Sequence, residues 1–146
     1  MTVEGTSGIL KVQNKSKNKG ASVRYVGKLD KKLYSCVTED ISTDEVVITD
    51  ERIKHIQERH PGNYEKISPF LQEALEVPDY ILEDKNPNTA LILKRVEVNG
   101  QRIQVVLRLH TSTDIEGFKN SIISAWEISE NRWKNYITNK IILYKF

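Results

Sequence analysis

Cysteine and histidine are scarce in this chain, which limits the cross-links and the metal sites that it can form. Cys36 is the one cysteine, so no disulfide can form within the chain, and this usage fits a reducing compartment. The three histidines are scattered, and His55 and His60 are five residues apart, not the four that bring two ligands to one helix face. We therefore expect no metal and no cofactor.

Long apolar runs are missing as well. No segment approaches the roughly 18 apolar residues that a membrane-spanning helix needs. The first residues also lack the apolar core of a secretory signal. With 38% hydrophobic and 29% charged residues, the 146 residues are enough for one compact domain with its own core. We expect a cytoplasmic protein without a membrane partner.

A large excess of one charge is absent, because the formal net charge is only +2, but the basic residues are unevenly spread. Between residues 11 and 32 there are one acid, Asp30, and eight bases: Lys11, Lys15, Lys17, Lys19, Arg24, Lys28, Lys31 and Lys32. Residues 1–20 are rich in Gly, Ser, Asn and Lys and predict a flexible basic arm, which leaves 21–146 as a single folded domain. Such an arm either binds nucleic acid through its phosphates or is a solubilising linker.

Two of the histidines lie on one predicted amphipathic helix, which begins after Thr49 and ends at Pro61-Gly62. Thr49 is a good N-cap, because its hydroxyl can accept from a free amide of the first turn. The spacing i, i+3, i+7 places Arg52, His55 and Arg59 on one face. A base that titrates near neutral pH beside fixed positive charges suits a phosphate ester, although a solvated surface helix gives the same pattern.

Short apolar runs and turn residues predict the other elements. Strands are expected at 23–26, 33–37, 46–48, 80–82, 120–128 and 141–144, and helices at 64–76 and 129–138. In the strand over 120–128, alternation puts Ile122, Ser124 and Trp126 on one side. Buried Ser and Trp need hydrogen-bond partners, so their presence alone does not mark a site.

The clearest local signal is the Asn99-Gly100 pair between two alternating apolar runs. Asn-Gly favours a two-residue type I′ turn, which predicts a hairpin with Val96 opposite Ile103. One face is apolar except for Lys94 and should pack against helices. The opposite face is basic and open, with Arg108 among leucines and valines at the end away from the turn. This predicts either a ligand platform or an ordinary solvated face.

Several segments together resemble a known family. They are the helix end Arg59-His60-Pro61-Gly62, the segment Asn86–Ala90, the strand end Leu107-Arg108-Leu109, Asn120–Ile123 with Trp126, and the terminal Ile142–Lys145. In order and spacing they resemble the phage-type barnase–EndoU–colicin–RelE-like (BECR) nuclease domain family, over roughly residues 23–146. The resemblance implies an α+β fold, with N-terminal helices packed on one face of a small antiparallel β-sheet. It also implies that the chain comes from a phage or mobile element and that it cleaves RNA without a metal ion.

The resemblance further implies a mechanism in which the ribose 2′-hydroxyl attacks the adjacent phosphorus and leaves a 2′,3′-cyclic phosphate. This reaction needs a base, an acid and positive charge around the phosphoryl oxygens. The catalytic candidates are His55 first and His60 second as base or acid, Arg59 and Arg108 as the charge clamp, and Ser121 or Ser124 as phosphate donors. The substrate-binding candidates are Trp126, Lys94 and Tyr144.

Two other functions fit the same sequence. A non-catalytic module of a phage structural protein would bind nucleic acid or a capsid protein, with both imidazoles turned to solvent or held by carbonyls. A mobile-element toxin would keep the ribonuclease chemistry and add an immunity or antitoxin protein as its partner. In the phage case the protein would be carried in the particle and delivered to the cytoplasm.

Overall fold

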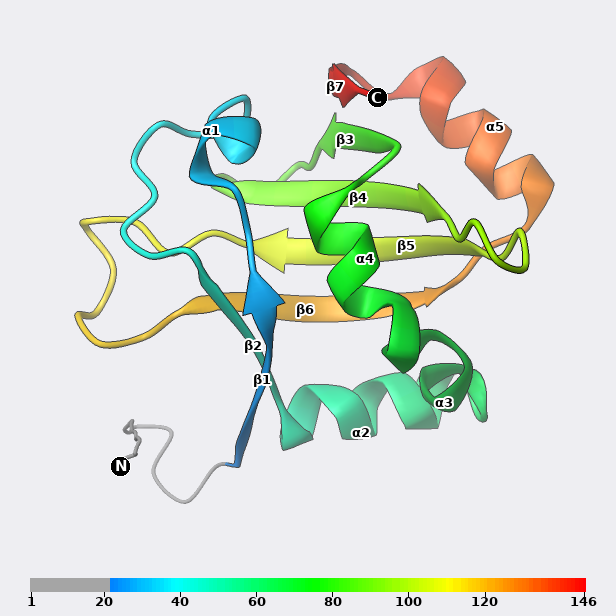
Figure 1. Ribbon diagram of the computed structural model, residues 1–146, viewed down its shortest axis with the longest axis horizontal. Helices are drawn as coiled ribbons and strands as arrows, with labels where there is room; N and C mark the ends of the chain where they lie inside the picture. Colours follow the sequence, from blue (N-terminus) through cyan, green and yellow to red (C-terminus); the bar gives the residue numbers. More distant parts are fainter. Residues whose placement is uncertain (1–21) are drawn as a thin grey trace.

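The computed structural model describes residues 22–146, so the arm predicted over residues 1–20 lies outside the described part. Most helices of this part of the chain come before residue 77, and most strands come after residue 79 (Figure 1). In chain order the elements are β1 (Val23–Lys28), α1 (Lys31–Tyr34), β2 (Glu45–Thr49), α2 (Asp50–Arg59), α3 (Asn63–Ile67), the 3₁₀ helix η1 (Ser68–Phe70), α4 (Leu71–Glu76), β3 (Tyr80–Glu83), β4 (Thr89–Arg95), β5 (Arg102–Arg108), β6 (Asn120–Glu127), α5 (Glu130–Asn139) and β7 (Ile142–Lys145).

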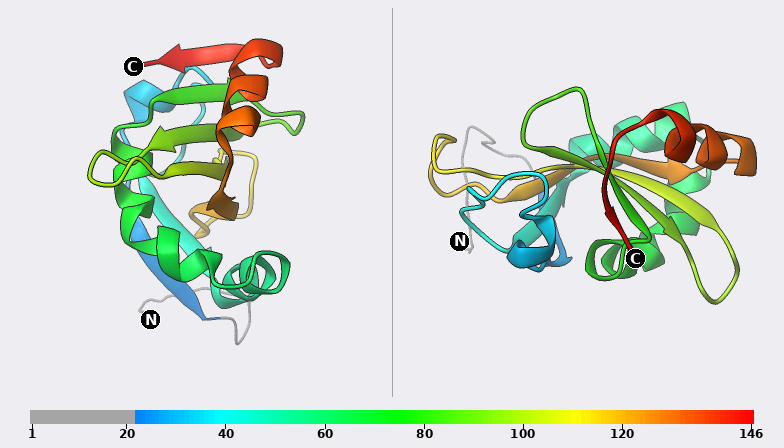
Figure 2. Two further views of the ribbon diagram at one scale, coloured as in Figure 1. Left: turned by 90° about the vertical axis from the view of Figure 1, so that its right-hand side faces the viewer. Right: turned by 90° about the horizontal axis from the view of Figure 1, so that it is seen from above.

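The strands form one sheet in the order β1-β2-β6-β5-β4-β3-β7. Neighbouring strands are antiparallel except for β2 and β6, which run parallel over a short stretch. Helix α4 lies against one face and α5 against the other, as the left view of Figure 2 shows. We refer to these faces as the α4 side and the α5 side. The expected α+β fold is confirmed, but α5 covers part of the face that was expected to be open.

Two apolar clusters hold the layers together, one on each side of the sheet. On the α4 side, Leu75 packs with Val105 and Leu107 of β5, and all three are fully buried. On the α5 side, Leu93 and Trp133 belong to a smaller cluster. Burying one such side chain contributes about 1.5–3 kcal/mol. The predicted packing of the apolar face of β5 against helices is therefore confirmed.

The register of the β4–β5 hairpin differs from the prediction. Ile92 pairs with Val105 instead of Leu107, so the ladder is shifted by two residues. The chain turns over residues 96–101, and only Gly100, with φ 72°, adopts the left-handed conformation. Asn99 instead accepts a backbone N–H with its side chain at 2.9 Å, so the two-residue type I′ turn does not form. Because the shift is even, each side chain keeps its predicted face.

Two other local predictions are wrong. The strand expected over residues 33–37 is replaced by α1, because the Asp30 side chain caps a helix that buries Tyr34 completely. In β6 the pairing with β5 shifts by one residue between Ser124 and Ile122. This irregularity turns Ile122 to the α4 side, where it joins the core, while Trp126 stays on the α5 side.

Candidate active site

Helix α2 places His60 at the edge of the α5 side. The Thr49 side chain accepts the backbone N–H of Arg52 at 3.2 Å, which caps the helix as predicted. Ile56 anchors the helix in the core, with 2% of its surface exposed. The helix ends at His60, and the turn that follows needs the φ of 78° that Gly62 supplies. The position of His60 is therefore fixed by the cap, the core and the turn.

The His60 ring is stacked on Trp126 of β6. The ring centroids lie 4.6 Å apart and the planes are inclined by 21°. The turn after α2 is tied to the same strand, because the Asn63 side chain accepts the backbone N–H of Glu127 at 2.7 Å. Neither ring nitrogen of His60 makes a hydrogen bond within residues 22–146. The imidazole is thus held by stacking, and both nitrogens remain available for proton transfer.

Trp126 continues a line of side chains across the sheet. Gln104 lies opposite Trp126 in the β5–β6 ladder and is 4% exposed. Tyr136 of α5 donates its hydroxyl proton to Gln104 Oε1 at 2.9 Å. His60, Trp126, Gln104 and Tyr136 therefore connect α2 to α5, and we name this line the cross-sheet row.

Two serines and Arg108 occupy the same face farther along the strands. Ser124 lies opposite Val106, and Ser121 lies opposite Arg108. Since a strand rises about 3.3 Å per residue, the five steps from Trp126 to Ser121 span about 16 Å, slightly less with the irregular pairing. The structure therefore separates Arg108 from His60, and the two cannot hold one phosphate together.

The Arg108 guanidinium is occupied by a carboxylate. Its Nη2 lies 2.9 Å from Asp114 Oδ1, and Nη1 donates to the carbonyl of Leu109. Asp114 also accepts the Thr111 backbone N–H at 2.8 Å. Burial by itself would raise the pKa of Asp114, but the hydrogen bonds from Thr111 and Arg108 outweigh it and hold the pKa below its ordinary value. Arg108 thus anchors the loop between β5 and β6.

The other predicted residues of α2 remain on its surface. His55 and Arg59 are exposed and make neither hydrogen bonds nor ion pairs to the described residues. Asp50 pairs with Arg24 of β1, and Gln57 donates to Glu65 of α3. These two contacts show which flank of α2 faces β1 and α3. Helical spacing places Arg59 on the opposite flank, toward the α5 side. Arg59 is therefore next to His60 in sequence and on the flank that borders the row.

Two substrate-binding candidates lie on the other side of the sheet. Lys94 is 8% exposed, donates to the carbonyl of Val77 at 2.7 Å and lies 3.7 Å from a Glu73 oxygen. Tyr144 of β7 packs against the core on the α4 side. The structure thus keeps both away from Trp126. The ammonium of Lys94 satisfies a helix-end carbonyl, which accounts for a lysine on an apolar face.

Gln104 and Tyr136 are the members of the row that the sequence did not single out. Gln104 was expected on this face, but its partner comes from a helix 32 residues farther along the chain. One signal was available for Tyr136. Arg132 and Lys140 stand four residues before and after it, a spacing that gathers two cations and an aromatic ring on one helix flank.

His110 has both ring nitrogens occupied. It is 8% exposed, its Nε2 donates to the carbonyl of Ile115 at 2.7 Å, and its Nδ1 accepts from the Ser42 hydroxyl. Its backbone N–H donates to Asn120 Oδ1 at 2.7 Å. His110 therefore fastens the β5–β6 loop to the segment before β2, in contrast to His60, whose ring nitrogens bond none of the described residues.

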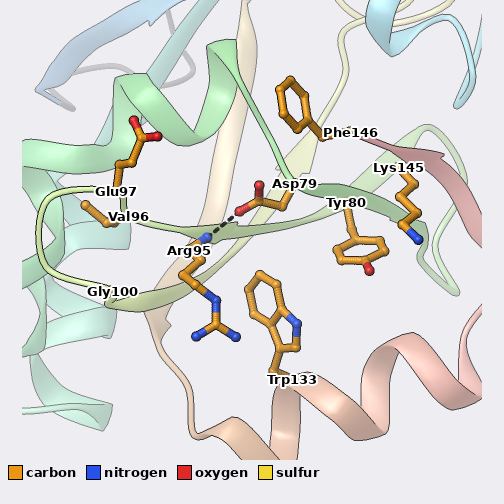
Figure 3. Close-up of a pocket in the computed structure, with 9 residues that line it drawn as sticks. All are labelled: Asp79, Tyr80, Arg95, Val96, Glu97, Gly100, Trp133, Lys145 and Phe146. Atoms are coloured by element: carbon orange, nitrogen blue, oxygen red, sulfur yellow. Dashed lines mark hydrogen bonds between the residues drawn. The ribbon is translucent and has the colours of Figure 1, made fainter.

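A hollow of about 460 Å³ lies where the hairpin meets α5 and the end of the chain (Figure 3). The Arg95 guanidinium carbon lies 5.2 Å from the Trp133 ring centroid, and Tyr80 meets Trp133 edge-on at 6.0 Å. The Asp79 carboxylate accepts the backbone N–H of Arg95 at 2.6 Å. The hollow shares no lining residue with the cross-sheet row, and acids and bases both line it.

Within residues 22–146, no three His, Cys, Asp or Glu side chains gather closely enough to hold a metal ion. Over the same range no helix combines the length and the apolar character that crossing a membrane requires.

A mostly antiparallel sheet with N-terminal helices on one face is consistent with a nuclease fold of the barnase, EndoU and RelE type. A family model described as phage-Barnase-EndoU-ColicinE5/D-RelE like nuclease 2 matches residues 17–145, and the chain belongs to this family. The resemblance found in the sequence is thereby confirmed. No curated protein and no solved structure matches the chain significantly.

Proposed function

We propose that this nuclease cleaves RNA without a metal ion, by attack of the ribose 2′-hydroxyl on the adjacent phosphorus, and that His60 transfers the proton. The observation that carries the proposal is the His60 ring stacked on Trp126, 4.6 Å between centroids, on a sheet face that also bears serine hydroxyls. Family membership supports a nuclease activity. The stacked imidazole supports a mechanism in which a side chain moves the proton.

In this mechanism the neutral imidazole of His60 accepts the 2′-hydroxyl proton as that oxygen attacks phosphorus. The bond from phosphorus to the 5′-oxygen breaks, and this oxygen takes a proton from water. The products are a 2′,3′-cyclic phosphate and a 5′-hydroxyl. Arg59 and the Ser124 hydroxyl stabilise the charge on the phosphoryl oxygens. The Trp126 ring restricts the imidazole to one plane, which reduces the entropy lost in reaching the reactive geometry.

The test compares two histidines of the same helix. The full chain is incubated with mixed-sequence RNA in EDTA, and initial rates are measured for the wild type, His60→Ala and His55→Ala. We expect cleavage by the wild type and a rate lower by about 10² to 10⁴ for His60→Ala. His55→Ala serves as the matched control, since it removes an exposed imidazole. A His60→Ala variant with the wild-type rate would refute the assignment.

A second candidate function is a non-catalytic nucleic-acid-binding module. The observation that favours it is the Asp114 carboxylate 2.9 Å from Arg108, which already neutralises the arginine that was expected to clamp the phosphate. In the assay above, such a module would bind RNA without cleaving it. The His60→Ala variant would bind RNA as tightly as the wild type does. A phage head protein or a dedicated inhibitor as partner stays a prediction from the sequence.

A further inference from the structure

Helix α5 and the residue that caps its C-terminal end carry two cations close to one aromatic ring. The Arg132 guanidinium carbon and the Lys140 ammonium each lie 5.8 Å from the Tyr136 ring centroid. Arg132 Nη1 also donates to the Tyr136 hydroxyl at 3.4 Å. The ring therefore holds both charges at the surface of one helix flank, since a cation over an aromatic face is attracted to it. We name Arg132, Tyr136 and Lys140 the α5 flank.

These two cations differ from the other arginines on the same side of the sheet. Arg95 and Arg102 both pair with Glu130, and Arg108 pairs with Asp114. In the described part of the chain no carboxylate lies within ion-pair distance of Arg132 or Lys140. Their charge is consequently not neutralised by any carboxylate of residues 22–146 and is available there to an anion.

The α5 flank is joined directly to the cross-sheet row. The Tyr136 hydroxyl bonds Gln104, and Gln104 lies opposite Trp126, on which His60 is stacked. Strands β5 and β6 are about 4.8 Å apart, so the flank begins roughly one strand from the stacked imidazole. Gln104 is 4% exposed, and its amide nitrogen makes no hydrogen bond to residues 22–146. This nitrogen still reaches the surface, so it can donate to a bound ligand.

We propose that the α5 flank is a binding site for the phosphodiester backbone of single-stranded RNA, next to the cleavage site and across the sheet from Arg59. Arg132 and Lys140 contact successive phosphates of the RNA. The Gln104 amide donates to the part of the RNA strand that lies between these two cations and Trp126. The site rests on the proposed function, because it places the substrate over His60. Lysine and arginine suit this ligand through charge, and Arg132 in the first turn of α5 and Lys140 at its C-cap give the RNA strand a direction along the helix.

Binding is measured with a labelled single-stranded DNA oligonucleotide, which has the same backbone but no 2′-hydroxyl for the proposed reaction. Fluorescence anisotropy gives the association constant over a series of salt concentrations. Lys140→Gln is compared with Lys134→Gln, which removes the same charge from an exposed position of α5 on the opposite flank. We expect Lys140→Gln, and separately Arg132→Gln, to reduce the salt slope by about 0.7 each, and Lys134→Gln to leave it unchanged.

The outcomes separate this proposal from the proposed function. Equal salt slopes for Lys140→Gln, Arg132→Gln and Lys134→Gln would overturn the α5 site, even if the protein cleaves RNA through His60. Reduced slopes for the first two variants support the site, even if no cleavage is found and the nuclease mechanism falls. Thermal unfolding of each variant shows that the compared proteins are folded. With two independent positions in the flank, a single misfolded variant does not remove the test.

Discussion

Asn120 joins three segments at the end of β6 that lies away from Trp126, and its substitution gives a sharp stability test. Its Nδ2 donates to the carbonyls of Thr43 at 2.8 Å and Glu45 at 2.9 Å, and its Oδ1 accepts the His110 N–H at 2.7 Å. The side chain is 0% exposed. It stands where β6 begins, beside the parallel pairing with β2. Asn120→Ala therefore breaks the connection between β2, β6 and the β5–β6 loop at one point.

The magnitude follows from the groups left without a partner. A buried donor or acceptor that loses its partner costs about 1–3 kcal/mol, and a carbonyl less than an N–H because it has a second lone pair. In Asn120→Ala, one backbone N–H and two carbonyls lose their hydrogen-bond partner. We therefore expect the free energy of unfolding to fall by about 3 kcal/mol. Asn120→Asp keeps the acceptor for His110 but turns a carboxylate toward two carbonyl oxygens.

The aspartate variant adds a pH dependence with a definite sign. Burial and the facing carbonyls raise the folded-state pKa of the new carboxyl above its unfolded value of about 3.9. Its neutral form is therefore favoured in the folded protein. The resulting stability is present at low pH and is lost as pH rises through the folded-state pKa. Asn120→Asp should thus be less destabilised, relative to the wild type, at pH 4.5 than at pH 8.

The assay is urea unfolding followed by tryptophan fluorescence, since Trp126 and Trp133 report on the sheet and on α5. The matched control is Ser121→Ala, one residue along the strand, whose hydroxyl bonds none of residues 22–146. We expect the control to stay within about 0.5 kcal/mol of the wild type. An Asn120→Ala variant as stable as Ser121→Ala would refute the reasoning.

Three further predictions concern other parts of the molecule. Tyr34→Phe removes a hydroxyl that donates to a buried backbone carbonyl at 2.7 Å, so urea unfolding should show a loss of about 1–2 kcal/mol. Burial raises the pKa of the Cys36 thiol, so iodoacetamide should alkylate it more slowly at pH 8 than it alkylates free cysteine, and an equal rate would contradict the burial. Hydrogen bonds from Thr111 and Arg108 hold the pKa of Asp114 low in the folded protein. The charged carboxylate therefore stabilises the fold above the unfolded-state pKa, and this stabilisation is lost as pH falls through the lower folded-state pKa. Asp114→Asn should therefore flatten the acid side of a curve of stability against pH.

The sequence predicted the elements whose signals are local. Thr49 caps α2, and the helix ends before Gly62, because capping and turn chemistry act within a few residues. Alternation sorted the faces of β4 and β5 correctly even though the register was wrong, because a shift of two residues keeps the faces. The Asn99-Gly100 pair misled the register, since the Asn99 side chain stabilises a wider turn instead.

The arrangement of the site depends on contacts that no local pattern contains. The cross-sheet row brings together His60, Trp126, Gln104 and Tyr136 from four elements. A hint that α5 would cover the second face was present in β4, where Leu91 and Leu93 point to the face expected to be open. A solvated face does not usually carry such a run, and a covering helix explains it.

The most direct test of the mechanism uses a DNA oligonucleotide that contains a single ribonucleotide. It is incubated with the full chain in EDTA, and the fragments are identified by mass spectrometry. If the 2′-hydroxyl is the nucleophile, the strand is cut only on the 3′ side of the ribose. One fragment then ends in a 2′,3′-cyclic phosphate and the other begins with a 5′-hydroxyl, and His60→Ala suppresses both. Cleavage within the DNA, fragments that end in a 3′-hydroxyl, or cleavage that appears only when a divalent metal is added would contradict the mechanism.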